Sequence, residues 1–353
     1  MTKQQYDDAI LDSNEISPTD KAGNPIPVTI PIALAPGVTV TYTTRLGGIS
    51  GADFGGCNLG GRTGDAPTAI AANRRALADQ LGRRLSLVGQ VHSGIAVDVD
   101  DLWEENADYG FDASGFTADE SVPPAAVSPS ADAPAAAPSA DAPTVAPRLI
   151  EADAQVTSRR GIALGVFAAD CLPVLLADAD AGVIGVAHCG RRGLEEGVIG
   201  ATVDLMTAKG AATERIVATL GPCICGDCYE VGGDMADAFD ARFPGTFTLS
   251  RFGQPGIDIA AAARAELAAA GIPRDNIIES RPRVAAATQY LGEDEELAGL
   301  CDADGEGPAL ADRIGQVRHS MCTVENPLWH SHRRAALAGK TTEGRMLALI
   351  ALD

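Results

Sequence analysis

The chain has few aromatic residues and few basic residues. Phe, Tyr and Trp make up 4% of its 353 residues, and 27 Lys and Arg stand against 48 Asp and Glu, which gives a formal net charge of −21. Proteins that bind nucleic acids need clustered basic side chains for the phosphates, and those that bind single strands also need aromatic side chains on which bases stack. We therefore expect no nucleic-acid partner.

The sequence also lacks an apolar run of membrane-spanning length. Its most apolar stretch, residues 162–187, is interrupted by Asp170, Pro173, Asp178 and Asp180, whereas a spanning helix needs about 20 apolar residues. The first residues, MTKQQYDDAILDSNEIS, contain no apolar segment typical of a secretory signal. We expect no membrane partner and a cytoplasmic location, where the eight cysteines stay reduced and serve as packing residues, metal ligands or nucleophiles.

Much of the acidic excess lies in two stretches that contain no basic residue. Residues 104–147 hold eight acids and end in the Pro- and Ala-rich SPSADAPAAAPSADAPTVAP, and residues 284–312 hold eight more. The composition of the first stretch offers too little apolar surface to offset the entropy lost on ordering. In a single domain of residues 1–353, we predict a flexible tail over 1–25, a disordered acidic insertion over 104–147 and an acidic loop insertion over 284–318.

The rest of the chain reads as an α/β protein. Short apolar runs between turn residues predict buried strands, and apolar residues at helical spacing before a glycine predict helices. The DADAG sequence at 178–182 predicts the turn of a hairpin. The strands expected are 38–42, 162–167, 174–176, 183–187, 216–220 and 346–352, and the helices expected are 67–81, 194–209 and 258–270.

Three short segments place a histidine or a cysteine at the end of an expected strand, where α/β proteins commonly build their sites. They are QVHS at 90–93, ADCLP at 169–173 and AHCGRRG at 187–193. Taken singly, a histidine in such a place is more often structural and a buried cysteine is more often packing. Together, His92, Cys171 and His188 offer two imidazoles and one thiolate, and three protein ligands leave a position free for water or substrate, as in catalytic zinc sites.

Nine short motifs in one order give a specific resemblance. The chain resembles the YfiH-type laccase-domain family, whose members are also called polyphenol-oxidase-like proteins or purine nucleoside phosphorylases. The motifs are TTRLGG at 43–48, CNLG at 57–60, NRRAL at 73–77, QVHS at 90–93, ADCLPVLLAD at 169–178, AHCGRRGL at 187–194, LGPCI at 220–224, YEVG at 229–232 and SHRR at 331–334.

The resemblance implies a fold, a cofactor and an activity. The fold would be one layered α/β/β/α domain, and a zinc ion would be held by His92, Cys171 and His188. The activity would be phosphorolysis of adenosine, inosine or methylthioadenosine, with deamination of adenosine as a companion reaction. The partners are then a purine nucleoside and phosphate.

Five more residues in the matching motifs are candidates for the site. Arg45 and Arg334 could bind phosphate, because the planar guanidinium suits phosphate oxygens. Asp170 could orient a ligand or carry a proton, or support the neighbouring cysteine. Asn58 and Gln90 could recognise a sugar hydroxyl or a base edge, or satisfy buried backbone groups.

The chain departs from the family pattern at two places. Arg191 stands where the family usually has a tryptophan, which removes one aromatic wall from the expected pocket. Cys223, Cys225 and Cys228 add three thiols after Leu220. A second metal there is conceivable, although these three thiols lack the paired spacing of a closed zinc site.

Three other functions also fit these residues. Two imidazoles and a thiolate also suit Cu²⁺, which would make the protein a laccase-like polyphenol oxidase, although five histidines are few for a multi-copper centre. A Cys171 nucleophile with a histidine base could hydrolyse amides, for instance in the editing of cell-wall peptidoglycan precursors. A metal-stabilised binding protein would bind zinc without turnover.

Overall fold

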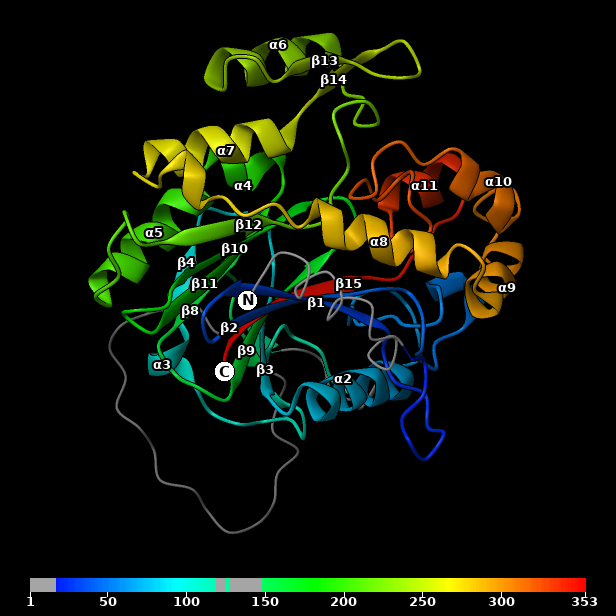
Figure 1. Ribbon diagram of the computed structural model, residues 1–353, viewed down its shortest axis with the longest axis horizontal. Coiled ribbons are helices and arrows are strands. Elements are labelled where there is room, and N and C mark those ends of the chain that lie inside the picture. Colours follow the sequence, from blue (N-terminus) through cyan, green and yellow to red (C-terminus); the bar gives the residue numbers. More distant parts are fainter. Residues whose placement is uncertain (1–16, 119–124, 127–147) are drawn as a thin grey trace, which may run out of the picture.

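Two β-sheets lie face to face between layers of helices in the computed structural model, which describes residues 17–118, 125–126 and 148–353 (Figure 1). The larger sheet has six strands, in the order β1 (Thr29–Ala35), β2 (Val38–Thr43), β15 (Met346–Leu352), β9 (Ile162–Ala168), β3 (Arg84–Val88) and β5 (Gly110–Ala113). The smaller has five, in the order β12 (Val217–Leu220), β10 (Leu172–Asp178), β11 (Val183–Cys189), β8 (Ala154–Thr157) and β4 (Ala96–Asp98).

The remaining elements are short strand pairs and helices. The pairs are β13 (Phe247–Leu249) with β14 (Pro255–Ile257), and β6 (Ala125–Ala126) with β7 (Arg148–Leu149). The α-helices are α2 (Pro67–Leu81), α3 (Val99–Leu102), α4 (Arg191–Glu195), α5 (Val198–Ala208), α6 (Gly233–Arg242), α7 (Ile259–Ala269), α8 (Arg281–Leu291), α9 (Glu295–Ala303), α10 (Leu310–Gly315) and α11 (His332–Leu337). None of the helices in the described residues has the length and apolar character needed to cross a membrane.

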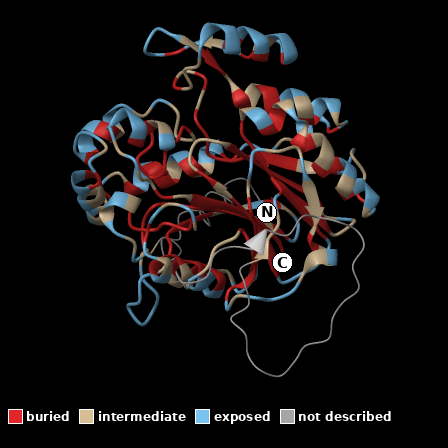
Figure 2. Ribbon diagram, turned by 180° about the vertical axis from the view of Figure 1, so that it is seen from behind, coloured by how far each residue is buried: buried red, intermediate tan, exposed pale blue. Residues whose placement is uncertain are grey.

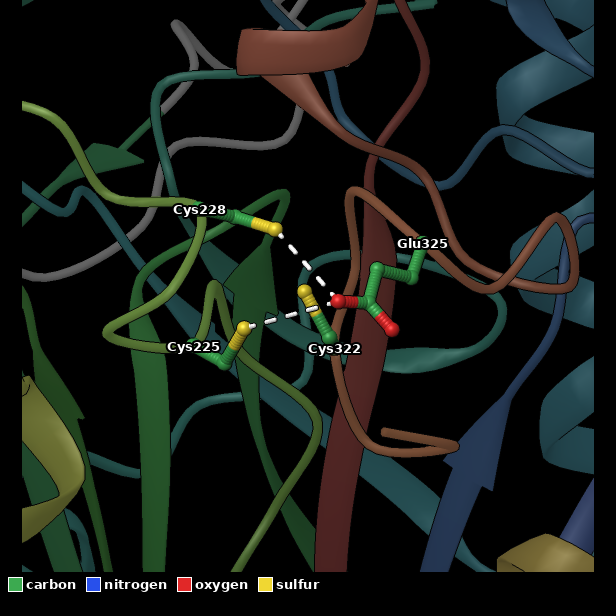
Figure 3. Close-up of side chains that lie close together, drawn as sticks. All are labelled: Cys225, Cys228, Cys322 and Glu325. Carbon is green, nitrogen blue, oxygen red and sulfur yellow. Dashed lines mark hydrogen bonds between the residues drawn. The ribbon is translucent and has the colours of Figure 1, made fainter. Parts of the chain in front are cut away.

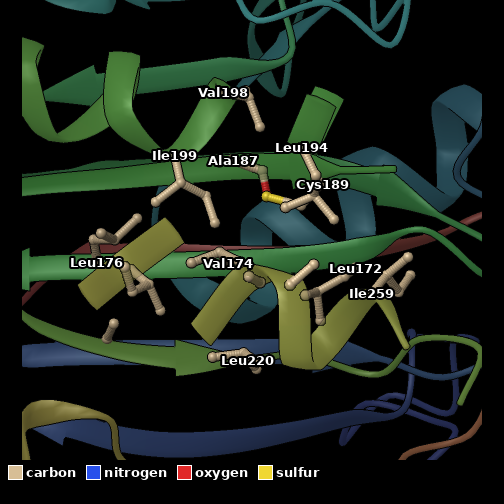
Figure 4. Close-up of a cluster of buried hydrophobic side chains, with 14 of the residues drawn as sticks. Leu172, Val174, Leu176, Ala187, Cys189, Leu194, Val198, Ile199, Leu220 and Ile259 are labelled. Atoms are coloured by element: carbon tan, nitrogen blue, oxygen red, sulfur yellow. The ribbon is translucent and has the colours of Figure 1, made fainter. Parts of the chain in front are cut away.

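Strand β10 shows how the sequence produces the layers. Successive side chains of a strand point to opposite faces of its sheet. Leu172, Val174 and Leu176 pack under α5 and α7 (Figure 4), whereas Leu175 and Ala177 pack against the six-stranded sheet. Because both faces are covered, the strand is apolar along its length and fully buried.

The opposite face of the six-stranded sheet is covered by α2. Leu77 of this helix packs in one cluster with Leu87 of β3 and Leu347 of β15. The buried residues follow the strands and the exposed ones follow the outer faces of the helices (Figure 2). The order of layers is therefore helix, six-stranded sheet, five-stranded sheet, helix, which confirms the α/β/β/α fold.

The predicted secondary structure is largely confirmed. All six predicted strands are present, β10 and β11 form the predicted hairpin, and α2 and α7 match the predicted helices within a residue at each end. Asp258 caps α7 by accepting a hydrogen bond from the backbone N–H of Ala261. The helix predicted over 194–209 is instead divided into α4 and α5, because Gly197 lies between them with a φ of 78° that interrupts a right-handed helix.

The acidic loop predicted over 284–318 is wrong. The segment forms most of α8 together with α9 and α10, and Val284, Leu291 and Leu297 are buried against the six-stranded sheet. Two of its acids, Asp304 and Glu306, are buried in ion pairs with arginines. The prediction rested on charge alone and overlooked the helical spacing of the apolar residues between the acids.

The prediction for 104–147 is also wrong at its start. Residues 110–113 form β5, which is buried and pairs with β3 in parallel, so the ordered domain continues past residue 104. Residues 119–124 and 127–147 of the predicted insertion lie outside the described residues, as do residues 1–16 of the predicted tail. The remainder of that tail contains a turn in which Asp20 accepts hydrogen bonds from the backbone N–H groups of Ala22 and Asn24.

Candidate metal centre and active site

His92, Cys171 and His188 meet at one end of the five-stranded sheet. Cys171 directly precedes β10 and His188 is the next-to-last residue of β11, and the antiparallel register pairs Pro173 with His188. His92 reaches them from the loop between β3 and β4. One donor atom from each of the three residues lies within 4.8 Å of the others, and Cys171 Sγ lies 3.7 Å from His92 Nε2.

The backbone around these residues is unusual in a way that favours a functional site. Among the described residues, His92 and Asp170 are the non-glycine residues with positive φ, at 63° and 104°. Such strain persists only where the surrounding structure holds it, and it is concentrated at functional sites. Gly190 is required for a different reason: a Cβ at this position would lie 2.9 Å from both Cys171 Sγ and the Cδ2 atom of His92.

The carboxylate of Asp153 connects His188 to the loop that carries His92. This fully buried residue comes directly before β8, and its Oδ1 lies 2.8 Å from His188 Nδ1. The same carboxylate accepts hydrogen bonds from the backbone N–H groups of His92 and Ser93 and from the Ser93 hydroxyl. It therefore fixes the His188 ring, leaves Nε2 of that ring for a metal, and sets the strained loop that carries His92.

The charges of the three side chains are coupled. Burial alone would raise the pKa of the Cys171 thiol, but His188 and His92 outweigh it and lower that pKa to about 6. Burial alone would lower the pKa of His188, but the charge of Cys171 and the hydrogen bond to Asp153 raise it to about 9. The site therefore favours a thiolate, which is the form of cysteine that binds metal.

The donor set fits a zinc ion. Zinc bonds of about 2.3 Å to sulfur and about 2.0 Å to nitrogen, at tetrahedral angles, place donor atoms about 3.3 to 3.5 Å apart. The 3.7 Å between Cys171 Sγ and His92 Nε2 is close to this spacing. Three protein donors leave the fourth position free, and all three residues line a cavity of about 530 Å³, a size suited to a small-molecule ligand.

The cavity has arginines on two sides. Arg62 and Arg345 lie beside the Gly60–Gly61 loop, and Arg191 and Arg333 lie near Tyr229. Arg62 makes neither an ion pair nor a hydrogen bond with any other residue that the structure describes. The lining residues are Gly60, Gly61, Arg62, Thr63, Val88, Gly89, Gln90, His92, Ser114, Phe167, Ala169, Asp170, Cys171, His188, Arg191, Ile224, Tyr229, Ile259, His332, Arg333 and Arg345.

The predicted phosphate ligands Arg45 and Arg334 are elsewhere. Neither lines the cavity, and both are buried. Arg45 forms an ion pair of 2.7 Å with Asp304, and Arg334 forms one of 2.7 Å with Glu306. These arginines neutralise acids of the 284–318 segment, so the structure does not support the assignment of either residue to phosphate.

Of three other predicted site residues, one lies outside the cavity and two line it. Asn58 is fully buried outside the cavity and bonds to Thr63 and Asp65, so it serves the loop itself. Gln90 lines the cavity, but its side-chain amide is taken by the backbone N–H and C=O of Phe167. Asp170 lines the cavity as well, and its two carboxylate oxygens accept hydrogen bonds from the Thr323 hydroxyl and the backbone N–H of Arg333, each of 2.6 Å.

Four residues of the site were not among those predicted from the sequence: Asp153 and the cavity arginines Arg62, Arg333 and Arg345. Asp153 has one usable signal, an acid directly before a buried strand, where an unpaired carboxylate would be costly. Arg333 also has a signal, because it lies in the SHRR motif at 331–334. Arg62 and Arg345 lie outside the nine motifs, and only the fold brings them to the cavity. Arg191, which replaces the expected tryptophan, does line the cavity and pairs with Glu195.

The thiols after β12 form a second group, with a different membership from the one predicted. Cys225 and Cys228 lie next to Cys322 and Glu325, which come about 100 residues later in the sequence. All four donor atoms lie within 4.8 Å of one another (Figure 3). Cys223 is buried outside this group.

The sequence matches a known family and several named proteins. The family model described as multi-copper polyphenol oxidoreductase laccase matches residues 39–291. A purine nucleoside phosphorylase of Streptomyces griseus is 38% identical over 234 residues, which cover 65% of this chain and 79% of that protein. A purine nucleoside phosphorylase of Corynebacterium glutamicum is 33% identical and covers 74% of this chain and 87% of its own. An adenosine deaminase of an unknown prokaryotic organism is 44% identical over 133 residues, which cover 36% of this chain and 51% of that protein.

Solved structures share the fold. The YlmD protein of Geobacillus stearothermophilus superposes with a TM-score of 0.62 at 25% identity, over 91% of this chain and 94% of its own. The hypothetical protein YfiH of Bacillus licheniformis superposes with a TM-score of 0.62 at 23% identity, over 90% of this chain and 93% of its own.

Proposed function

This chain belongs to the multi-copper polyphenol oxidoreductase laccase family, and from that premise we propose that it catalyses the phosphorolysis of purine nucleosides at His92, Cys171 and His188. One observation carries the proposal: the cavity that contains these three donors also contains four arginines. The names of the Streptomyces and Corynebacterium relatives, purine nucleoside phosphorylase, are consistent with it.

Phosphate binding falls to the cavity arginines. In phosphorolysis, a phosphate oxygen attacks C1′ of the ribose, the bond from C1′ to N9 of the base breaks, and the leaving base takes up a proton. The planar guanidinium binds phosphate oxygens in pairs. Arg62 is the foremost candidate, because it has no other partner among the described residues, and Arg345 stands beside the same glycine loop.

The nucleoside would lie between the arginines and the three donors. Phe167, Ile224 and Tyr229 give the cavity an apolar surface for a purine base. Arg333 lies 5.6 Å from the ring of Tyr229 and donates a hydrogen bond to the backbone C=O of Glu230, which holds this wall in place. Gln90 and Asp170 position the surrounding backbone through the hydrogen bonds described above.

Zinc is the metal that we propose for the three donors. When bound, a zinc ion supplies a Lewis acid that polarises oxygen atoms and lowers the pKa of water. Copper also suits two imidazoles and a thiolate, but a multi-copper centre needs many more imidazoles. The second donor group among the described residues contains no histidine and therefore does not resemble a copper cluster. The three donors at the cavity favour a single ion there.

The test is an incubation of the zinc-loaded protein with adenosine, with and without phosphate, in which adenine, ribose 1-phosphate and inosine are resolved. We expect ribose 1-phosphate and adenine in equal amounts, and only with phosphate. Inosine without phosphate would support the deaminase activity that the prokaryotic relative's name suggests. Turnover of neither kind would contradict the proposal.

A second experiment, on the metal-free protein, distinguishes a metal-dependent enzyme from a cysteine hydrolase. The distance of 3.7 Å between Cys171 Sγ and His92 Nε2, and the lowered pKa of Cys171, would also suit a thiolate nucleophile. We expect the metal-free protein to be inactive on nucleosides. Amide hydrolysis that persists without metal and is abolished by a thiol alkylating reagent would replace the phosphorylase proposal.

A further inference from the structure

A second group of metal donors lies outside the cavity and plays no part in the proposed reaction. Cys225 and Cys228 belong to the loop after β12, and Cys322 and Glu325 belong to the segment before α11, about 100 residues later. Figure 3 shows the four side chains converging on one point between the two segments. Cys228 and Cys322 are almost fully buried and Glu325 is 7% exposed.

The distances match one tetrahedral ion. Zinc bonds of about 2.3 Å to sulfur and about 2.0 Å to oxygen place sulfur and oxygen donors about 3.5 Å apart, and two sulfur donors about 3.8 Å apart. Glu325 Oε1 lies 3.6 Å from Cys228 Sγ and 4.0 Å from Cys225 Sγ. All four donor atoms lie within 4.8 Å of one another.

The backbone of both segments is shaped for paired ligands. Cys225 and Cys228 have the Cys-x-x-Cys spacing, and Cys322 and Glu325 repeat it with a carboxylate in the second place. The backbone C=O of Cys225 accepts hydrogen bonds from the N–H groups of Cys228 and Tyr229, and that of Cys322 accepts one from Asn326. Each segment therefore makes a tight turn that points two donors the same way.

Glu325 is held with one oxygen turned toward the thiols. Its Oε2 accepts hydrogen bonds from the backbone N–H groups of Arg318 and His319, of 2.7 and 2.9 Å. Its Oε1 faces the thiols, forms an ion pair of 3.1 Å with Arg251 and lies 3.4 Å from Nδ1 of His319. Arg251 offsets the single charge of the carboxylate, whereas three thiolates beside it would need a further cation among the four donors.

A disulfide would leave part of this group unexplained. All eight cysteines are free in the structure. A bond between any two of the three thiols would leave the third thiol and the carboxylate facing it without a common partner. A single divalent cation satisfies all four donors at once, and three soft thiolates favour zinc over magnesium or calcium.

We propose that Cys225, Cys228, Cys322 and Glu325 bind a second zinc ion, which is structural. Four protein donors fill a tetrahedral shell, so no position is left for a substrate. The ion joins two segments that are far apart in the sequence. Cys223 and Cys322 already pair there in a short parallel bridge.

The position of this ion links it to the wall of the cavity. Ile224 and Tyr229, on the first segment, line the cavity. The backbone N–H of Ile224 donates to the backbone C=O of Asp170, and the hydroxyl of Thr323, on the second segment, donates to the Asp170 carboxylate. The ion would thus hold both segments against Asp170, the strained residue next to Cys171.

The test is the zinc content per chain of the purified full-length protein, measured by elemental analysis under reducing conditions. We expect two zinc ions for the wild type and one for Cys228→Ser. The matched control Cys223→Ser, which changes a buried thiol next to the group, keeps two. One zinc in the wild type that Cys228→Ser retains and His92→Ala loses would overturn the proposal, whether or not the protein is a phosphorylase.

A second measurement on the wild type covers the case in which Cys228→Ser fails to fold. Replacement of zinc by Co²⁺ gives absorption from sulfur ligands, and its intensity counts the thiolates at each ion. We expect one ion with three sulfur ligands and one with a single sulfur ligand. Intensity from a single sulfur ligand in total, or a disulfide found within the group by mass spectrometry of the freshly reduced protein, would contradict the second site.

Discussion

The two donor groups of this protein differ in openness, and the difference separates a candidate catalytic centre from a candidate structural one. The open centre consists of three donor residues, His92, Cys171 and His188; it lies on a cavity of about 530 Å³, and its His92 has a positive φ. The closed centre consists of four donor residues, Cys225, Cys228, Cys322 and Glu325. Of these, Cys225 alone is more than slightly exposed, and none of the four lines the cavity.

The support behind the donors differs as well. In the open centre a buried carboxylate, Asp153, orients the His188 ring and the loop of His92 from outside the donor set. In the closed centre the carboxylate of Glu325 is itself a donor. A protein can thus use similar ligand chemistry for two purposes, and the purpose depends on whether the fold leaves one position free.

Loss of a donor from the open centre should have the largest effect. His92→Ala should remove one of two zinc ions and reduce phosphorolysis by about 10³-fold or more, because the Lewis acid is lost. His330→Ala, which changes a histidine outside the cavity and outside both donor groups that bonds to the backbone C=O of Cys57, is the control. Loss of both ions from His92→Ala would remove the distinction between the centres, and full activity without the first ion would refute its role.

The next largest effect is expected at Asp153. Asp153→Asn should reduce zinc affinity of the open centre or activity by about 10- to 100-fold, since an amide cannot accept all the hydrogen bonds that orient His92 and His188. Asp178→Asn removes a carboxylate that is equally buried but bonds to Arg215 and backbone far from the cavity. This control should lower thermal stability and keep both ions. Unchanged zinc affinity and activity in Asp153→Asn would contradict the supporting role.

Substitution of Arg62 tests phosphate binding in the cavity without removing a donor of either metal. Arg62→Ala should raise the KM for phosphate by about 10-fold and leave the KM for nucleoside nearly unchanged, because it removes a charge-assisted hydrogen bond. Arg334→Ala, in the buried ion pair with Glu306, should lower thermal stability instead. An increase in the nucleoside KM alone would move Arg62 from phosphate to sugar or base recognition.

Gly190 should give the smallest effect. Gly190→Ala forces a Cβ against Cys171 Sγ and His92 Cδ2, each at 2.9 Å, so we expect zinc affinity at the open centre to fall several-fold while the closed centre stays full. The control is Gly200→Ala in α5, where a Cβ meets no heavy atom within 4 Å. Equal zinc affinity in Gly190→Ala and the wild type would show that the open centre tolerates a wider spacing.

Local pattern was sufficient for most of the fold. The alternation in β10 and the glycines after α2 and α7 are local signals, so the strands and those helices could be predicted. The helical segment 284–318 could not be predicted from its charge, because two of its acids, Asp304 and Glu306, are neutralised by Arg45, Arg313 and Arg334 only after folding.

The candidate site was predictable only in part. His92, Cys171 and His188 stand beside strand ends in recognisable motifs, whereas the partners of Arg45 and Arg334 lie on segments that no local pattern connects. The closed centre shows the same limit. The sequence drew attention to Cys223, Cys225 and Cys228, but the fold replaces Cys223 with Cys322 and Glu325.

The most direct test is a crystal structure of the zinc-loaded protein with anomalous scattering measured at the zinc absorption edge. We expect two peaks per chain. One lies among His92 Nε2, Cys171 Sγ and His188 Nε2 with its fourth position facing the cavity, and the other lies among Cys225, Cys228, Cys322 and Glu325. The absence of a peak at the first position, or a fourth protein ligand that closes it, would show that His92, Cys171 and His188 do not form a catalytic metal centre.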